Sequence, residues 1–102
     1  MLTRNEFHVL LALLQGARHG YGIMQDVDAL TDGDLRLGPG TLYTAIKRLV
    51  NAGLIEECAA EADRRRCDRV TRKGRGAASA EAEQLSALLR TARKRGLLTS
   101  ES

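Results

Sequence analysis

Residues 39–53, PGTLYTAIKRLVNAG, decide the predicted fold. Pro39 suits the first position of a helix, where no backbone N–H is needed, and Gly53 suits the position after its end. Apolar side chains at helical spacing predict one buried stripe, consisting of Leu42, Ile46, Leu49 and Val50. The opposite face has donors and cations but no acid, which favours contact with a phosphate-rich groove. Its members are Thr41, Thr44, Lys47, Arg48 and Asn51.

Two helices are predicted before this one. Thr3 and Glu6 have the spacing of a capping box, and the helix that they begin runs to about Gln15. Its main apolar stripe consists of Phe7, Leu10, Leu11 and Leu14. A second stripe, Val9 and Leu13, is expected to face a second subunit. After a glycine-punctuated turn over residues 17–22, the next helix reaches about Leu30, with Ile23, Val27 and Leu30 facing inward.

Short strands and a basic segment are predicted around the central helix. Residues 35–37 alternate and are long enough for one brief strand, while residues 54–60 and 67–71 predict a hairpin with a loop over 61–66. The segment 64–75, RRRCDRVTRKGR, has seven basic residues and one acid, Asp68. Such a local field attracts polyanions. The hairpin tip, with Arg64, Arg65 and Arg66, is therefore expected to contact DNA phosphates.

A long helix is predicted from about Arg75 to Arg95. Its apolar positions repeat like a short heptad seam and consist of Ala78, Ala82, Leu85, Leu89 and Ala92. A helix of about 30 Å is too long for a core this small to cover, so we expect the seam to form a homodimer. The expected organisation is a DNA-binding domain over 1–74, a dimerisation helix over 75–96 and a flexible tail over 97–102. The fold class is mainly α with a small β-hairpin.

Composition restricts the remaining function classes. The chain has 102 residues, a formal net charge of +3 and only three aromatic residues, Phe7, Tyr21 and Tyr43. No apolar run is long enough to cross a membrane and no signal peptide is recognised, so we expect a cytoplasmic protein. No nucleophile–base pair, phosphate loop or paired carboxylates suggest an enzyme, and no cofactor is expected. His8 and His19 lack the ligand spacing of a zinc site, so no metal is expected.

The two cysteines, Cys58 and Cys67, fall on the two predicted strands of the hairpin. Without export signals they are expected to be half-buried, reduced thiols. The alternative is a redox switch, because the two residues are placed to face each other and a cross-strand disulfide would deform the hairpin.

Three stretches resemble the PadR family of bacterial transcriptional regulators. They are residues 10–23 (LLALLQGARHGYGI), residues 37–49 (LGPGTLYTAIKRL) with the GLI of 53–55, and the basic segment from Arg64 to Gly74. The resemblance implies a winged helix-turn-helix repressor that dimerises through one C-terminal helix. It places Tyr21 near the DNA backbone and opens the recognition helix with Gly40, Thr41, Tyr43 and Thr44. The chain departs from the family at Cys67 and Asp68, where aromatic residues are usual.

The sequence therefore predicts a winged helix-turn-helix protein that binds double-stranded operator DNA as a homodimer and acts as a repressor. Tyr43 is assigned to DNA contact or to the edge of the core, and Tyr21 to DNA contact or to a structural role. The competing interpretation is a winged-helix module that binds another protein; basic and polar residues on the tip and outer helix face argue against it. Whether a small-molecule effector binds is left open, and the scarcity of aromatic residues argues against a large stacking pocket.

Overall fold

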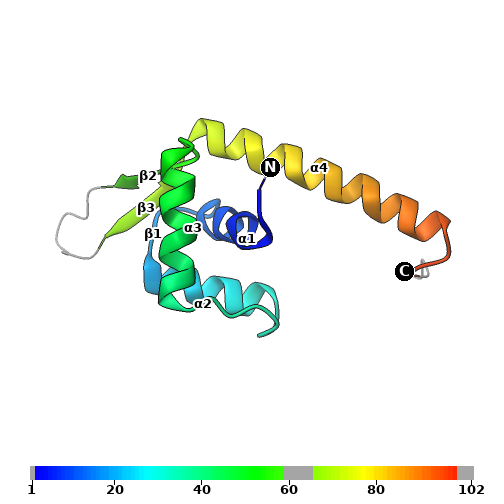
Figure 1. The fold of residues 1–102 in the computed structure, drawn as a ribbon, viewed down its shortest axis with the longest axis horizontal. Coiled ribbons are helices and arrows are strands. Elements are labelled where there is room, and N and C mark those ends of the chain that lie inside the picture. The colour runs from blue at the N-terminus through cyan, green and yellow to red at the C-terminus, as the bar shows by residue number, and fades with distance from the viewer. Residues whose placement is uncertain (1, 59–65, 99–102) are drawn as a thin grey trace.

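The structure is a computed structural model that describes residues 2–58 and 66–98. It is mainly helical, with one small antiparallel sheet, which confirms the predicted fold class (Figure 1). In chain order the elements are α1 (Arg4–Leu13), β1 (Arg18–His19), α2 (Gly20–Leu30), α3 (Pro39–Asn51), β2 (Ile55–Cys58), β3 (Cys67–Val70) and α4 (Arg72–Lys94). The first three helices and the sheet form the body, and α4 extends away from it (Figure 1).

The core lies between α1, α2 and α3 and continues onto β2 and the start of α4. Its largest apolar side chains are Leu10, Leu13, Ile23, Leu42, Ile46, Leu49, Ile55, Val9 and Val27. Two inward assignments were wrong, because Leu30 and Val50 are exposed. Leu30 is the last residue of α2, and Val50 lies at the margin of the apolar face of α3. In α1 the buried apolar side chains are those of the predicted second stripe together with Leu10 and Ala12, whereas Phe7, Leu11 and Leu14 are only partly buried.

This packing corrects the assignment of Val9 and Leu13. Both side chains are buried within the chain itself, at 0% and 1% exposure, so neither is available to a second subunit. Ala78 of α4 is likewise buried, in the same core cluster. The first two turns of α4, through Ala78, therefore belong to the body, and the exposed part of the predicted seam comes later in the helix.

The sheet has the strand order β1-β3-β2, and both pairings are antiparallel. The β2–β3 hairpin was predicted, and its register pairs Ile55 with Val70 and Cys58 with Cys67. The third strand is β1, which pairs Arg18 with Asp68. The prediction of a strand over residues 35–37 was wrong: this segment is irregular, and Leu37 is buried in the core instead.

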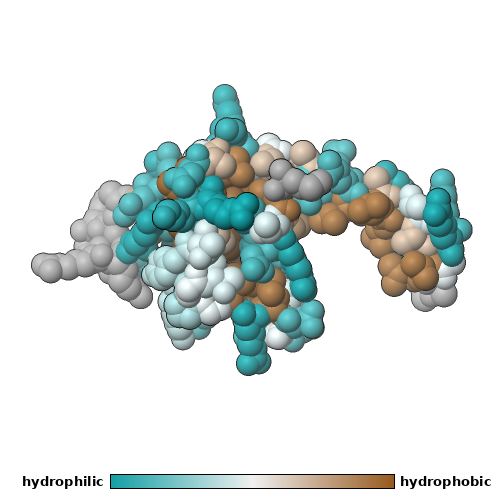
Figure 2. Space-filling view, in the orientation of Figure 1, coloured by the Kyte–Doolittle hydropathy of each residue, from teal (hydrophilic) through white to brown (hydrophobic). Residues whose placement is uncertain are grey.

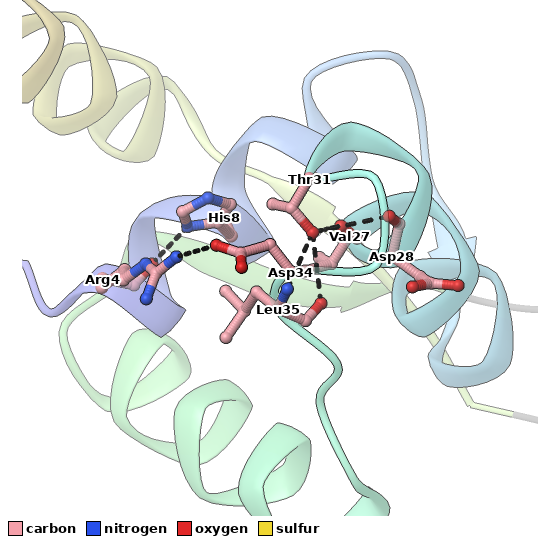
Figure 3. A network of polar contacts seen from close by, with 7 residues as sticks. All are labelled: Arg4, His8, Val27, Asp28, Thr31, Asp34 and Leu35. Atoms are coloured by element: carbon pink, nitrogen blue, oxygen red, sulfur yellow. Dashed lines mark hydrogen bonds and ion pairs between the residues drawn. The ribbon is translucent and has the colours of Figure 1, made fainter.

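The connection between α2 and α3 is held by local hydrogen bonds (Figure 3). The Thr31 hydroxyl donates to the Val27 carbonyl oxygen at 2.9 Å and accepts from the Leu35 backbone N–H at 3.0 Å. Arg4 of α1 pairs with Asp34 at 3.4 Å, but both side chains are exposed, so this ion pair adds little stability. These contacts terminate α2 and turn the chain toward the start of α3 (Figure 3).

Two backbone features join α3 to α4. Gly53, at φ +76°, ends α3 with the paired hydrogen bonds of a Schellman motif, from the N–H groups of Gly53 and Leu54 to the carbonyls of Val50 and Leu49. Thr71 then caps α4: its hydroxyl accepts from the Gly74 N–H at 3.0 Å and donates to the Gly53 carbonyl at 2.7 Å. Because of this cap, α4 begins at Arg72, one turn before the predicted start.

The long helix gives the molecule its shape. The molecule measures 51 × 27 × 22 Å along its principal axes, and the longest dimension follows α4 (Figure 1). None of the helices in the described part of the chain is both long and apolar enough to span a membrane.

Candidate nucleic-acid interface

The exposed face of α3 is the centre of the candidate interface. Successive helical residues are rotated by about 100°, which places Gly40, Thr44, Lys47 and Asn51 along its middle. All four are exposed, as are Thr41 and Arg48 along the edge nearest α1. The helix has no acidic residue, so this face presents only hydroxyls, amides and cations to solvent. The predicted outward positions of α3 are all where the sequence placed them.

Arg48 has a partner that the sequence did not indicate. Its Nε lies 3.1 Å from Oε2 of Glu6, whose side chain is only 7% exposed. The other carboxylate oxygen of Glu6 accepts from the backbone N–H of Thr3 at 3.0 Å, which completes the capping box of α1. Removing Arg48 would leave a nearly buried carboxylate without this cation, which is costly. Arg48 therefore joins α3 to α1, while its side chain stays 64% exposed, and its contact with DNA stays a prediction.

A cleft of about 410 Å³ separates the start of α3 from α2 and the sheet. Its floor is apolar, with Met24, Leu42 and Ile46. Tyr21 and Tyr43 line it from α2 and α3, and their side chains are 63% and 55% exposed. A Cβ atom at Gly20 would lie only 3.7 Å from the Tyr43 hydroxyl oxygen, so this ring lies close against the start of α2. The two tyrosines are thus neighbours on one face.

The N-termini of α2 and α3 both lie beside this cleft, which Gly20 and Pro39 line. In the described residues, neither helix has a side-chain hydrogen bond at its N-cap, and neither has an acid in its first turn. The first N–H groups of a helix have no partner within the helix, and together with the positive end of the helix dipole they favour an anion at each position. This arrangement suits the phosphates of a nucleic-acid backbone.

The sheet places one predicted arginine beside the same cleft. Arg66 and Asp68 both line it, and the two side chains are joined by hydrogen bonds of 2.9–3.2 Å. The hydrogen bond to Asp68 raises the pKa of Arg66 above its ordinary value, so the guanidinium stays charged. Nδ1 of His19 and the Arg66 carbonyl oxygen are 3.2 Å apart, which ties β1 to this end of β3. Arg64 and Arg65, the other two arginines of the predicted tip, lie outside the described residues.

The two cysteines form a disulfide between β2 and β3, which corrects the expectation of two reduced thiols. They are directly opposite in the hairpin register, and their Cα atoms are 5.3 Å apart, within the range that a disulfide requires. The bond closes the hairpin at its last described residue pair before the tip. Whether it acts as a redox switch stays a prediction.

An apolar surface follows α4 beyond the body (Figure 2). Leu85, Leu88 and Leu89 are 45%, 66% and 38% exposed. Of the predicted seam, Ala82 is exposed and Ala92 is partly buried. Leu88 was not in the predicted set, because it lies beside the heptad positions rather than on them. Its exposure widens the apolar surface on this helix.

Comparisons with known proteins bear on this architecture. The model of the PadR-like family of transcriptional regulators matches residues 9–80, which is more than half of the chain. The chain belongs to the PadR-like family. Membership makes it a DNA-binding transcriptional regulator and confirms the family resemblance found in the sequence. Among curated proteins, none matches the sequence.

Solved structures of transcriptional regulators share the fold. A transcriptional regulator from Clostridium thermocellum has a TM-score of 0.80 at 23% identity, over 96% of this chain and 100% of that one. A PadR family regulator from Clostridium difficile has a TM-score of 0.77 at 18% identity, over 90% and 97%. BpsR from Bordetella bronchiseptica, whose DNA binding is regulated by 6-hydroxynicotinic acid, has a TM-score of 0.74 at 23% identity, over 97% and 69%.

Proposed function

We propose that this PadR-like protein is a repressor that binds a pseudo-palindromic operator as a homodimer. The observation that supports this best is the acid-free, exposed face of α3 beside two helix N-termini and an arginine-bearing hairpin. In the proposed complex α3 enters the major groove, where base edges can be distinguished. In this proposal the protein acts in the cytoplasm, and DNA binding needs neither catalysis nor a cofactor.

Roles within the interface follow from position. Thr44 and Lys47, at the middle of the α3 face, contact base edges, and Gly40 lets the backbone of the first turn approach the DNA closely. Thr41, at the edge of that face, contacts bases or the adjoining phosphate. Tyr21 and Tyr43 donate their hydroxyls to backbone phosphates. Arg64, Arg65 and Arg66 contact phosphates beside the groove, and these contacts fix the register of the protein on the duplex.

The homodimer is proposed to form through the exposed part of α4. Its apolar surface consists of Ala82, Leu85, Leu88, Leu89 and Ala92. These residues lie on the part of α4 that leaves the body (Figure 2), and all of them except the partly buried Ala92 are exposed. The same part of a second copy is the complementary apolar surface, and pairing removes both from water. Two-fold symmetry would then place two α3 helices for two half-sites.

The test is selection of bound fragments from a genomic DNA library, followed by footprinting of the enriched sequence. The expected result is a protected region with two inverted half-sites whose centres lie about 10 base pairs apart. Protection of one unpaired half-site would contradict the dimeric mode. The absence of any enriched fragment, together with no binding to random duplex at low salt, would contradict DNA binding and favour a protein-binding module.

A further inference from the structure

Asp68 is a buried acid on the surface proposed to bind DNA. It lies on β3, the central strand of the sheet, and is only 1% exposed. Its register partner on β1, Arg18, is instead paired with Asp26 at 2.8 Å. Burying a carboxylate is unfavourable unless it is paired and hydrogen-bonded. The fold therefore depends on a cationic partner for Asp68, and that partner is Arg66.

The contact between these two side chains is close and multiple. Nε of Arg66 donates to both carboxylate oxygens of Asp68, at 3.1 and 3.2 Å, and Nη2 donates to Oδ1 at 2.9 Å. Two nitrogens on one carboxylate fix the plane of a guanidinium as well as its position. Moving Arg66 away would leave the Asp68 carboxylate buried and unpaired, which is strongly unfavourable. Arg66 is thus held in one place before any ligand arrives.

That place is the cleft between α3 and the sheet. Arg66 and Asp68 line it from the sheet, Tyr43 and Pro39 from α3, and Tyr21 from α2. The Arg66 side chain keeps 39% of its surface exposed, whereas that of Asp68 has 1%. A guanidinium has five N–H donors, so pairing with one carboxylate still allows it to bind a second acceptor. An arginine that is already fixed loses less side-chain entropy when it binds.

We propose that Asp68 is a positioning residue for DNA binding: it fixes the Arg66 guanidinium at the cleft beside α3, where Arg66 binds one backbone phosphate together with the Tyr43 hydroxyl. The inference rests on the proposed function. It separates Arg66 from the other arginines of the hairpin tip, since its position is set by a buried acid. It also gives Asp68, where the chain departs from the usual family sequence, a role in recognition.

The test exploits opposite signs. Asp68→Asn removes one negative charge from the surface that faces DNA, which by charge alone would strengthen binding. If Asp68 positions Arg66, the same change weakens binding. The matched control is Glu57→Gln, because Glu57 is the exposed register partner of Asp68 on β2 and lies near enough to Arg66 to affect its pKa through charge.

Affinity for a random-sequence DNA duplex is measured at low salt for both variants of the full chain. We expect Glu57→Gln to bind as tightly as the wild type or more tightly. We expect Asp68→Asn to bind about tenfold or more weakly, the loss of a hydrogen-bonded charged contact. An affinity for Asp68→Asn equal to or above that of Glu57→Gln would overturn the proposal. A wild-type protein that binds no duplex would instead overturn the proposed function.

A double-mutant cycle separates positioning from a general loss of structure. Arg66→Lys keeps the charge but lacks the planar guanidinium, and it is expected to weaken binding by a similar factor. If Asp68 acts through Arg66, the double variant binds no more weakly than Arg66→Lys alone. Multiplied losses would overturn the proposal. Urea unfolding of each variant shows whether it is folded under the conditions of the binding measurement. Should Asp68→Asn not fold, an affinity of Arg66→Lys equal to that of the wild type would still overturn the proposal.

Discussion

Lys47 lies at the middle of the exposed face of α3, where a side chain is best placed for the floor of the major groove. We expect Lys47→Ala to reduce discrimination between operator and random duplex by about 1–3 kcal/mol, the usual value of one base contact. The measurement is the ratio of the two affinities at one salt concentration. Lys94→Ala, at the far end of α4, makes the same charge change away from the interface. An equal loss on both duplexes for Lys47→Ala would assign it to phosphate contact instead.

The Cys58–Cys67 disulfide is expected to contribute to stability because it lowers the conformational entropy of the unfolded chain. The residues are nine apart in sequence, and in the chain-entropy account a loop of this size contributes about 2–3 kcal/mol. We expect the variant with both cysteines replaced by serine to have a free energy of unfolding that is lower by that amount, as measured by urea unfolding. The same comparison in excess reductant is the control, since the difference should then disappear. Identical midpoints under oxidising conditions would exclude this contribution.

Individual contacts were the part of the site that the sequence could not predict. The exposed residues of α3 follow from periodicity and were predicted. The pairing of Arg48 with Glu6 joins residues 42 positions apart, and no local pattern indicates it. Asp68 was recognised as a departure from the family and as the one acid of a basic segment. Its burial depends on the β1–β3 pairing, which no sequence pattern indicated.

At the scale of elements, the start of α4 has two glycines in contrasting surroundings. A Cβ atom at Gly74 would overlap the Leu54 carbonyl oxygen. The close approach of the two backbones here therefore requires glycine. Gly76 lies two residues later in the same helix and has open space around it. The two positions therefore form a matched pair for mutation to alanine.

We expect Gly74→Ala to lower the free energy of unfolding by about 1–3 kcal/mol or more, as overpacking does. Gly76→Ala should instead raise it by about 0.5–1 kcal/mol, because alanine is the better helix former. Urea unfolding of both variants provides the comparison. A Gly74→Ala protein as stable as the wild type would mean that α4 can move away from the sheet at little cost.

Helices whose ends have clear capping signals in the sequence were predicted well, and short strands were not. The start of α1 and both ends of α3 follow from a capping box, a proline and a glycine, each with a local physical reason. In contrast, β1 is only two residues long and exists through its pairing with β3, some 50 residues away. Residues 35–37 alternate as a strand would, but they are not part of the sheet, which consists of β1, β3 and β2, and Leu37 enters the core.

At the scale of the whole molecule, the exposed leucines of α4 are the residues that we propose to form the dimer interface. Leu85→Glu together with Leu89→Glu would place four charges in the proposed dimer interface, and burying unpaired charge is unfavourable. We expect this variant to sediment as a monomer at concentrations where the wild type is a dimer. Ala87→Glu, on the opposite side of the helix, is the control and should leave the dimer intact. A monomeric wild type at micromolar concentration would contradict the proposed assembly.

The placement of acids at the far end of α2 has a consequence for the rate of association. Asp26, Asp28, Asp32 and Asp34 lie at or beyond the C-terminal half of this helix, whereas its N-terminus adjoins the cleft. An 11-residue helix is about 16 Å long, so Asp32 and Asp34, which follow its last residue, are separated from its N-terminus by more than a Debye length at physiological ionic strength. Three of these acids are paired with arginines, Asp26 with Arg18, Asp28 with Arg36 and Asp34 with Arg4, so much of the negative charge at this end is neutralised. The acid-free face of α3 is cationic, and the phosphates of a duplex are attracted to that face and not to the far end of α2. Encounters are steered toward the productive orientation, and this kinetic advantage diminishes as ionic strength rises.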